Sequence, residues 1–281
     1  MPDGVAITRN GHRTLLKWHR GRKRLADLPF TGERILEGMR LGASVEVDLV
    51  KHADGGFAVL HDFSLAHDTT GEGLVKDAPA AALRRLFLRD GQGRPTTHQL
   101  MLFEDLCALL AAGEGIAPEA LLQLDLKEEG RGAIGAREVA AFADAATPVR
   151  QHLILSGGSA DNVGMLAAAT PGLAIGYDPC AAPVVARLVV TRAFDRFVAD
   201  ALAAAPEARM IYLAYQLVLY AADQGFDLIG AFHAAGKTVD AWTLDAATPE
   251  NAARAERLLA LNVDQITTDD PEALEALLLR A

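Results

Sequence analysis

The sequence predicts an α/β protein, a (β/α)8 TIM barrel with a small insertion after the second strand. Three observations predict it. The chain has 281 residues, an ordinary length for such a barrel. Short runs rich in Val, Ile and Leu alternate with longer Ala-, Leu- and Glu-rich segments of helical period, the pattern of repeated β-α units. Eight such strand-like runs occur, and no Pro- or Gly-rich linker divides the chain, so we expect one domain over residues 1–281.

The strands of a parallel barrel are covered by helices, so each should be a short, nearly continuous apolar run. Eight runs have this character, and several carry polar residues near their carboxyl ends. An open α/β sheet with extra strands is the alternative arrangement. The strands are predicted at residues 14–19, 44–50, 121–127, 152–158, 173–179, 210–215, 238–244 and 263–269.

The segments between the strands are long enough for helices, and their apolar residues recur with helical period. The helices are predicted at about residues 29–41, 99–112, 133–146, 160–169, 181–204, 221–235, 248–260 and 271–280.

One interval breaks this rhythm. About 70 residues separate the second strand from the third, against about 20 to 35 between the others. Residues 52–56 contain an Asp-Gly turn signal and precede the alternating FAVLHD, which predicts a hairpin. Loops at the carboxyl ends of barrel strands carry the chemistry, so the insertion, at about 51–98, is expected to wall the active site.

Charge and composition exclude several classes of function. Lys and Arg number 27 against 37 Asp and Glu, a net charge of −10, which disfavours nucleic acid and anionic membranes as partners. The basic tract Arg22, Lys23 and Arg24 could recruit a second phosphate or be a solvated surface cluster. Two cysteines, Cys107 and Cys180, make a disulfide framework or a thiolate zinc site improbable.

No apolar stretch resembles a signal peptide or is long enough to span a bilayer. We therefore expect a cytoplasmic protein without stable membrane insertion. The sequence does not determine the oligomeric state, and a homo-oligomer is one alternative.

Carboxylates gather at two of the predicted strands. Glu46 and Asp48 are two apart and share one strand face, and Asp125 lies in the third strand. On an exposed strand such acids would form a solvated face, but Val45 and Val47 alternate with them. Acids pointing into a barrel mouth repel one another unless a cation lies between them. Oxygen ligands favour one divalent cation, Mg²⁺ or Ca²⁺, over zinc, which usually takes imidazole or thiolate.

Two histidines, His19 and His61, each end a predicted strand. Imidazole titrates closest to neutral pH, so this pair could serve as acid and base. Arg20 and Lys127 lie at the same strand ends, and a phosphodiester needs such positive charge for its oxygens. Lys127 could instead form only a salt bridge. A structural role is the interpretation for the other histidines, which are His12, His52, His67, His98, His152 and His233.

Several motifs occur together in one order between residues 14 and 271, and they are similar to those of the glycerophosphodiester phosphodiesterase family. They are WHRG, GASVEVDL, ADGGFAVLHD, TTGEG, LDLK, AWTLD and VDQITTDDP. His19 precedes Glu46 by 27 residues, close to the family's spacing, whereas the other basic pair, His12 and Arg13, lies too far upstream.

The resemblance implies a barrel that hydrolyses glycerophosphodiesters to glycerol 3-phosphate and an alcohol, a hydrolase of glycerol and lipid metabolism. It implies an acid/base pair and a neighbouring hydroxyl of the substrate that attacks phosphorus, giving a cyclic phosphate that water opens. By residue, it assigns His19 and His61 to acid/base catalysis, Glu46, Asp48 and Asp125 to the metal, Arg20 and Lys127 to the phosphate, and Trp242 to the glycerol end.

Two departures from the family pattern concern the substrate more than the reaction. Residues 29–32 replace the family's P-E-N-T, and Asp125 replaces a glutamate that is one methylene longer. The alternatives are a phospholipase C- or D-like phosphodiesterase on the same barrel, or a non-catalytic barrel that binds a phosphopolyol. Since both histidines and the E-x-D motif are present, the sequence favours an enzyme.

Overall fold

The computed structural model describes residues 2–128, 130 and 132–280. Their contacts divide them into two compact units. Unit 1 contains the described residues of 1–19, 23–25 and 175–281, and unit 2 contains those of 20–22 and 26–174. The 3-10 turn η1 (His19–Gly21) joins them along the chain.

Unit 1 is built on parallel strands. β2, β12, β11, β10 and β9 follow one another in the sheet, each parallel to the next, and β1 pairs antiparallel with β2. Parallel pairing brings the carboxyl ends of these strands to one edge. Their bounds are β1 (Ala6–Arg9), β2 (His12–Trp18), β9 (Ala174–Tyr177), β10 (Met210–Ala214), β11 (Thr238–Leu244) and β12 (Gln265–Thr268).

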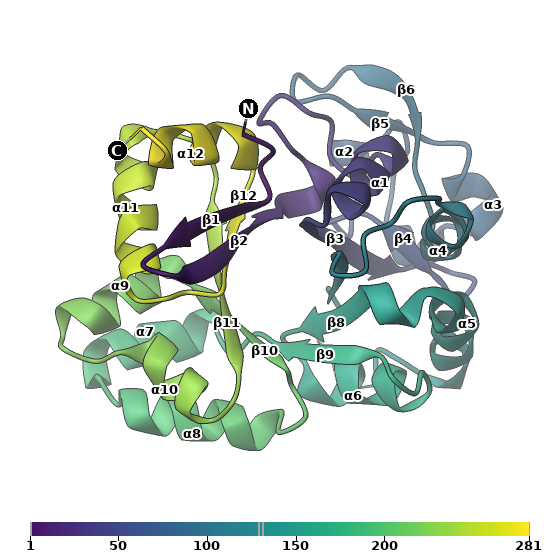
Figure 1. Cartoon of the computed structure of the whole chain (residues 1–281). Helices are drawn as coiled ribbons and strands as arrows, with labels where there is room; N and C mark the ends of the chain where they lie inside the picture. The colour runs from purple at the N-terminus through teal and green to yellow at the C-terminus, as the bar shows by residue number, and fades with distance from the viewer. Residues whose placement is uncertain (1, 129, 131, 281) are drawn as a thin grey trace. The chain divides into compact units, whose positions relative to one another are not determined.

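The helices of unit 1 cover the strands on one side (Figure 1). α9 and α10 pack against β11, and α12 packs against β1 and β2. Their bounds are α7 (Ala182–Thr191), α8 (Phe194–Ala204), α9 (Tyr215–Asp223), α10 (Leu228–Ala234), α11 (Pro249–Ala260) and α12 (Pro271–Leu278).

A buried ion pair lies among the strands of unit 1. The Lys17 ammonium is 3.2 Å from Asp240 Oδ2 and 4.5 Å from the centre of the Tyr212 ring. Asp240 also accepts hydrogen bonds from the Gln265 amide, at 2.7 Å, and from the Thr267 hydroxyl, at 2.8 Å. Because Lys17 and Asp240 are both buried, removal of either would leave an uncompensated charge in the core.

Unit 2 has a second run of strands. β8 is parallel to β7, β7 is parallel to β3, and β4 returns antiparallel to β3. All of β3 except its last residue is buried, as expected for a strand covered on both faces. The bounds are β3 (Ser44–Lys51), β4 (Phe57–Val59), β7 (Leu121–Leu126) and β8 (Leu153–Gly157).

Four α-helices and a 3-10 turn complete the regular part of unit 2. Phe142 of α5 stacks on Phe103 of α4, with ring centres 4.9 Å apart, and meets Phe57 of β4 edge-on. These aromatic contacts tie the helices to the hairpin strand that leads to His61. The bounds are α1 (Gly32–Leu41), α4 (Phe103–Ala112), α5 (Ala136–Ala146), η3 (Thr147–His152) and α6 (Ala160–Ala168).

The predicted insertion at 51–98 is present and begins with the predicted hairpin, in which the turn at 52–56 joins β3 to β4. The remainder is short elements and a two-stranded sheet of β5 and β6. Its bounds are α2 (Leu65–Asp68), η2 (Val75–Asp77), α3 (Ala80–Leu83), β5 (Phe87–Arg89) and β6 (Pro95–Gln99).

Each of the eight predicted strands is present, but two predicted helices were wrong. The segment 181–204 forms α7 and α8, because Arg192 has φ of 53° and ends α7. The segment 221–235 forms α9 and α10, separated at Gly225, and α9 begins earlier, at Tyr215. The apolar pattern continues across Arg192, so it could not locate the first break. The second break lies in the mainly polar stretch 223–227, whose Gly225 is a residue that commonly ends helices.

Asp227 caps the amino end of α10, where its Oδ1 accepts the Gly230 N–H at 2.8 Å. Replacing Asp227 with alanine is expected to lower the free energy of unfolding by about 1 kcal/mol, because a backbone donor loses its partner. Urea unfolding would measure this. Glu207→Ala, at an exposed position, is the control and should change stability by less than about 0.5 kcal/mol. Equal stabilities for the two variants would contradict the capping role.

Candidate active site

Three carboxylates lie together on neighbouring strands of unit 2. Glu46 and Asp48 share a face of β3, and Asp48 is in register with Asp125 of the parallel strand β7. One oxygen of each carboxylate lies within 4.8 Å of the others. Glu46 is 4% exposed and Asp48 is 1% exposed, while Asp125 is half-buried. The structure therefore brings together the three residues predicted to bind a metal.

Two cations contact this acidic cluster. The Lys127 ammonium is 2.6 Å from Asp48 Oδ1 and 2.6 Å from Asp125 Oδ2. Arg20 Nε is 3.4 Å from Asp48 Oδ2, and the Arg20 backbone N–H donates to Glu46 Oε2 at 2.8 Å. The salt bridge considered for Lys127 is present, and its predicted contact with phosphate stays a prediction.

The charges of the cluster are mutually stabilised. Burial alone would raise the pKa of Asp48, but Lys127, Arg20 and His61 together lower it below its ordinary value. Burial alone would lower the pKa of Lys127, but Asp48, Asp125 and Glu46 raise it above its ordinary value. Asp48 is therefore an anion and Lys127 a cation at neutral pH.

The donor set fits a hard divalent cation. Three carboxylate oxygens converge, and such oxygens are the ligands that Mg²⁺ and Ca²⁺ prefer. Lys127 already contacts two of the three acids, so a bound cation would share their oxygens with the ammonium. Asp125, although shorter than glutamate, reaches the cluster.

His61 follows β4 and lies beside the acidic strand, since the Leu60 N–H donates to the Asp48 carbonyl at 3.1 Å. Its Nδ1 is 2.6 Å from Asp62 Oδ1. A carboxylate at Nδ1 holds the imidazole in one orientation and leaves Nε2 for proton transfer. Asp62 was not among the predicted site residues, although it belongs to the motif FAVLHD.

Asp62 also belongs to a second group of ligand atoms, with His67 and Asp68, all within 4.8 Å of one another. His67 Nδ1 lies 2.6 Å from Asp68 Oδ1 and 3.5 Å from Asp62 Oδ2. The His67 side chain is 78% exposed, so this group differs from the buried cluster around Asp48.

Unit 1 holds the two remaining predicted site residues. His19 directly follows β2, and its Nδ1 is 2.5 Å from Oδ1 of Asp269, which follows β12. The parallel pairing of Trp18 with Thr268 brings these two strand ends together. Trp242 lies on β11, half-buried, and its indole N–H has no hydrogen-bond partner among the described residues. Asp269 was also missed by the sequence analysis.

The predicted site residues thus fall into two groups. His19 and Trp242 belong to unit 1, and His19 is joined directly to Arg20 through the peptide bond. The group within unit 2 contains Arg20, Glu46, Asp48, His61, Asp125 and Lys127.

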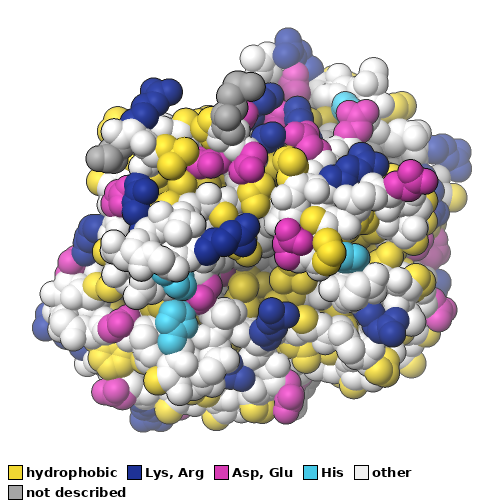
Figure 2. All heavy atoms as spheres, viewed as in Figure 1, with side chains coloured by type: hydrophobic (Ala, Val, Ile, Leu, Met, Phe, Trp, Pro, Cys, Tyr) yellow, Lys and Arg dark blue, Asp and Glu magenta, His cyan; other side chains and the backbone are white. Residues whose placement is uncertain are grey.

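The basic tract at 22–24 is only partly exposed, with Arg24 exposed, Arg22 half-buried and Lys23 buried. Lys23 is 9% exposed, and its ammonium lies 5.6 Å from the centre of the Trp18 ring. Arg24 forms an ion pair with Glu272. On the described part of the face in Figure 2, Lys and Arg side chains are interspersed with Asp and Glu and form no continuous basic stripe.

His52 is buried in the hairpin turn and accepts the Asp54 backbone N–H at 3.2 Å through Nδ1. Burial lowers its pKa below 6.5, so the unfolded chain takes up a proton at higher pH than the folded chain. The stability it contributes is present above about pH 6.5 and is lost as pH falls toward the lowered pKa. In His52→Gln the free energy of unfolding is expected to depend less on pH. For one proton the slope is at most about 1.4 kcal/mol per pH unit.

Urea unfolding of wild type and His52→Gln between about pH 5 and pH 8 would measure this dependence. The exposed His98→Gln serves as the control and should follow the wild-type curve. If the stability of His52→Gln falls with acid as steeply as that of the wild type, the assignment to His52 is wrong.

None of the helices in the described part of the chain combines the length and the apolar character needed to cross a bilayer.

The chain is similar to solved structures of low sequence identity. A glycerophosphoryl diester phosphodiesterase of Parabacteroides distasonis matches at a TM-score of 0.66 and 16% identity, over 97% of this chain and 88% of that chain. A glycerophosphodiester phosphodiesterase of Thermotoga maritima matches at 0.63 and 19%, over 95% and 99%. A phosphodiesterase of Oleispira antarctica, in complex with the product sn-glycerol-3-phosphate, matches at 0.64 and 18%, over 95% and 96%.

These likenesses show the fold, a closed barrel of eight parallel strands surrounded by helices, and confirm the predicted fold class. A comparison with curated protein sequences gives no match. The family model described as the glycerophosphoryl diester phosphodiesterase family matches residues 19–273. That match covers most of the chain, including all the predicted site residues, and confirms the predicted enzyme class. The chain therefore belongs to the glycerophosphoryl diester phosphodiesterase family.

Proposed function

We propose that the chain hydrolyses glycerophosphodiesters to glycerol 3-phosphate and an alcohol, with one divalent cation and two histidines. The observation that carries the proposal is the buried cluster of Glu46, Asp48 and Asp125 in contact with Lys127 and Arg20. The match to the family supports it, as does the product complex of the Oleispira antarctica protein.

In this proposal Glu46, Asp48 and Asp125 hold the cation, Mg²⁺ or Ca²⁺. When bound, such a cation stabilises negative charge that develops on phosphate oxygens. Arg20 and Lys127 supply the fixed positive charge beside it. Because Asp48 and Asp125 keep the Lys127 ammonium protonated, its charge is available to a phosphodiester anion at neutral pH.

His61 and His19 carry the protons. Each imidazole has a carboxylate at Nδ1, Asp62 for His61 and Asp269 for His19, so Nε2 is the nitrogen left for the substrate. One histidine takes the proton of a neighbouring glycerol hydroxyl as its oxygen bonds to phosphorus. The other gives a proton to the alcohol oxygen as its bond to phosphorus breaks. Water then opens the cyclic phosphate with the two roles reversed.

Trp242 is assigned to the glycerol end of the substrate. It lies on β11 and presents a half-buried ring whose N–H has no partner among the described residues. An indole packs against an apolar carbon skeleton and can donate one hydrogen bond. The single domain over residues 1–281, the cytoplasmic location and a small-molecule diester as partner stay predictions from the sequence.

A screen with the purified chain tests the proposal. Glycerophosphocholine, glycerophosphoethanolamine, glycerophosphoglycerol and glycerophosphoinositol would each be offered with Mg²⁺ or Ca²⁺, and products followed by phosphorus NMR. We expect glycerol 3-phosphate from at least one of them, preceded by a transient cyclic phosphate. Lysophosphatidylcholine and phosphatidylinositol test the phospholipase alternatives. Binding of all diesters without turnover would support the non-catalytic barrel and contradict the proposal.

A further inference from the structure

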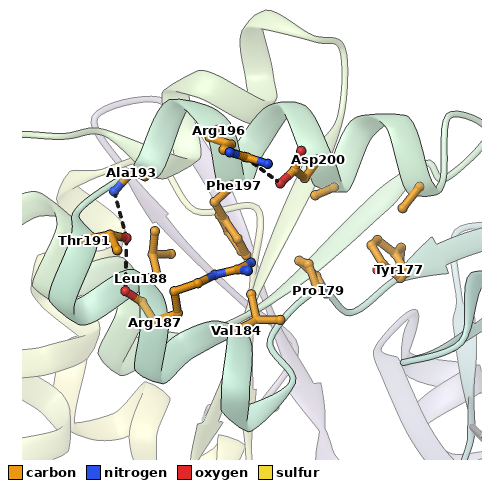
Figure 3. Close-up of a pocket in the computed structure, with 12 residues that line it drawn as sticks. Tyr177, Pro179, Val184, Arg187, Leu188, Thr191, Ala193, Arg196, Phe197 and Asp200 are labelled. Atoms are coloured by element: carbon orange, nitrogen blue, oxygen red, sulfur yellow. Dashed lines mark hydrogen bonds and ion pairs between the residues drawn. The ribbon is translucent and has the colours of Figure 1, made fainter.

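A pocket lies in unit 1, and none of the residues that line it is assigned to the reaction (Figure 3). It is formed by α7 and α8 and reaches Tyr177 and Pro179 at the carboxyl end of β9. Its volume is about 380 Å³, within the range of small-molecule sites. The reaction proposed above uses none of its residues.

The lining is mainly apolar and elongated. α7 contributes Val184 and Leu188, which are four apart and share one helix face. α8 and the residue before it contribute positions from Ala193 to Ala204, which at 1.5 Å per residue is about 16 Å of helix. Small side chains at Ala201 and Ala204 leave room beside α8. These features suit a linear apolar chain better than a compact ring.

Two exposed arginines, Arg187 and Arg196, belong to the lining of this pocket. Figure 3 shows the Arg187 side chain crossing from α7 toward Phe197 of α8. Arg187 has no acidic partner among the described residues, whereas Arg196, also in the lining, is 3.5 Å from Asp200. The pocket therefore has one positive charge that no carboxylate balances, in a chain whose net charge is −10.

This charge favours a monoanion. The planar guanidinium matches the two oxygens of a carboxylate and can bind both at once. A phosphate monoester has nearly two negative charges, whereas Arg187 is matched to one, and Arg196 already has Asp200 at 3.5 Å.

We propose that the pocket between α7 and α8 binds an amphiphilic carboxylate with one unbranched alkyl chain, of the fatty-acid class. Arg187 binds the carboxylate, and the chain lies along Phe197, Leu188 and Ala201. None of these residues is assigned to the proposed phosphodiester chemistry, and the proposal does not depend on it.

Titration calorimetry with decanoate tests the proposal, together with three comparison probes. Acetate carries the anion without the chain, decyltrimethylammonium carries the chain with the opposite charge, and decyl phosphate carries more charge. We expect decanoate to bind with one-to-one stoichiometry and each comparison probe to bind at least about tenfold more weakly. Decyltrimethylammonium binding as tightly as decanoate, or decyl phosphate binding tenfold more tightly, would overturn the assignment.

Two variants locate the site. Arg187→Gln is expected to weaken decanoate binding about tenfold or more, while Arg192→Gln, an exposed arginine of the same region, should bind as the wild type does. Ala204→Leu should weaken decanoate but not a shorter carboxylate such as hexanoate, because it fills one end of the pocket. Turnover of a glycerophosphodiester should be unchanged in Arg187→Gln.

Unchanged decanoate affinity in both Arg187→Gln and Ala204→Leu would overturn the proposal. Sedimentation velocity of the same samples measures their oligomeric state and so tests whether a second copy of the chain occupies the pocket instead. A dimer that Arg187→Gln or decanoate dissociates would assign the groove to a second copy of the chain, and would likewise overturn it.

Discussion

Replacing His61 with alanine is expected to lower the turnover of a glycerophosphodiester by about two to four orders of magnitude. His61 is the proposed proton carrier of unit 2, lying beside the acidic strand with its Nδ1 held by Asp62. Alanine removes the transferable proton without disturbing the core, because the imidazole is partly exposed. The measurement is kcat at saturating substrate and cation, with the unfolding midpoint recorded on the same preparation.

Two further variants sharpen this test. His98→Ala changes an exposed histidine of the same unit and should leave kcat within about twofold, as expected for a residue outside the reaction. Asp62→Asn should lower kcat less than His61→Ala and should shift the pH profile of kcat, since Asp62 acts only through the imidazole. A His61→Ala enzyme with the wild-type rate would exclude the acid/base assignment whatever its stability.

Removal of divalent cations is expected to abolish activity. After treatment with EDTA the rate should fall to background, and Mg²⁺ or Ca²⁺ should restore it, because three anionic side chains converge at the proposed site. Glu46→Gln removes one ligand charge and should raise the cation concentration for half-maximal activity by about ten- to a hundredfold. The assay is turnover against free cation concentration.

Asp68→Asn is the matched control, because Asp68 belongs to the other, exposed group of ligand atoms. Its cation dependence should follow that of the wild type. If Asp68→Asn needs more cation for half-maximal activity and Glu46→Gln does not, the cation acts at the exposed group. Full activity in EDTA would refute any metal requirement.

The sequence predicts the strands well because a strand covered by helices must be apolar along its whole length. β3 shows this, since only Glu46 and Asp48 interrupt its apolar run, and both lie in the acidic cluster. The break within 181–204 was not predictable in the same way. An apolar helical pattern runs across Arg192 unchanged, and only its backbone conformation shows that the helix ends there.

Where a motif names a residue, as for His19, His61 and Lys127, the sequence is enough to nominate that residue for the candidate site. The hydrogen-bond partners of these residues were not predictable where only the fold brings the two side chains together. Asp269 reaches His19 only because β2 and β12 are neighbours in the sheet. In the sequence Lys23 is one residue of a basic tract, and its contact with the Trp18 ring is visible only in the structure.

The ion pair between Lys17 and Asp240 also constrains how this enzyme can diversify. If either residue changes alone, the other's charge stays unpaired in the interior. The two positions are therefore epistatic, although they are far apart in the sequence. A lineage can replace them only together, or through an ancestor that folds poorly. Directed evolution that randomises one half of the coding sequence at a time would therefore retain this pair, whatever activity is selected.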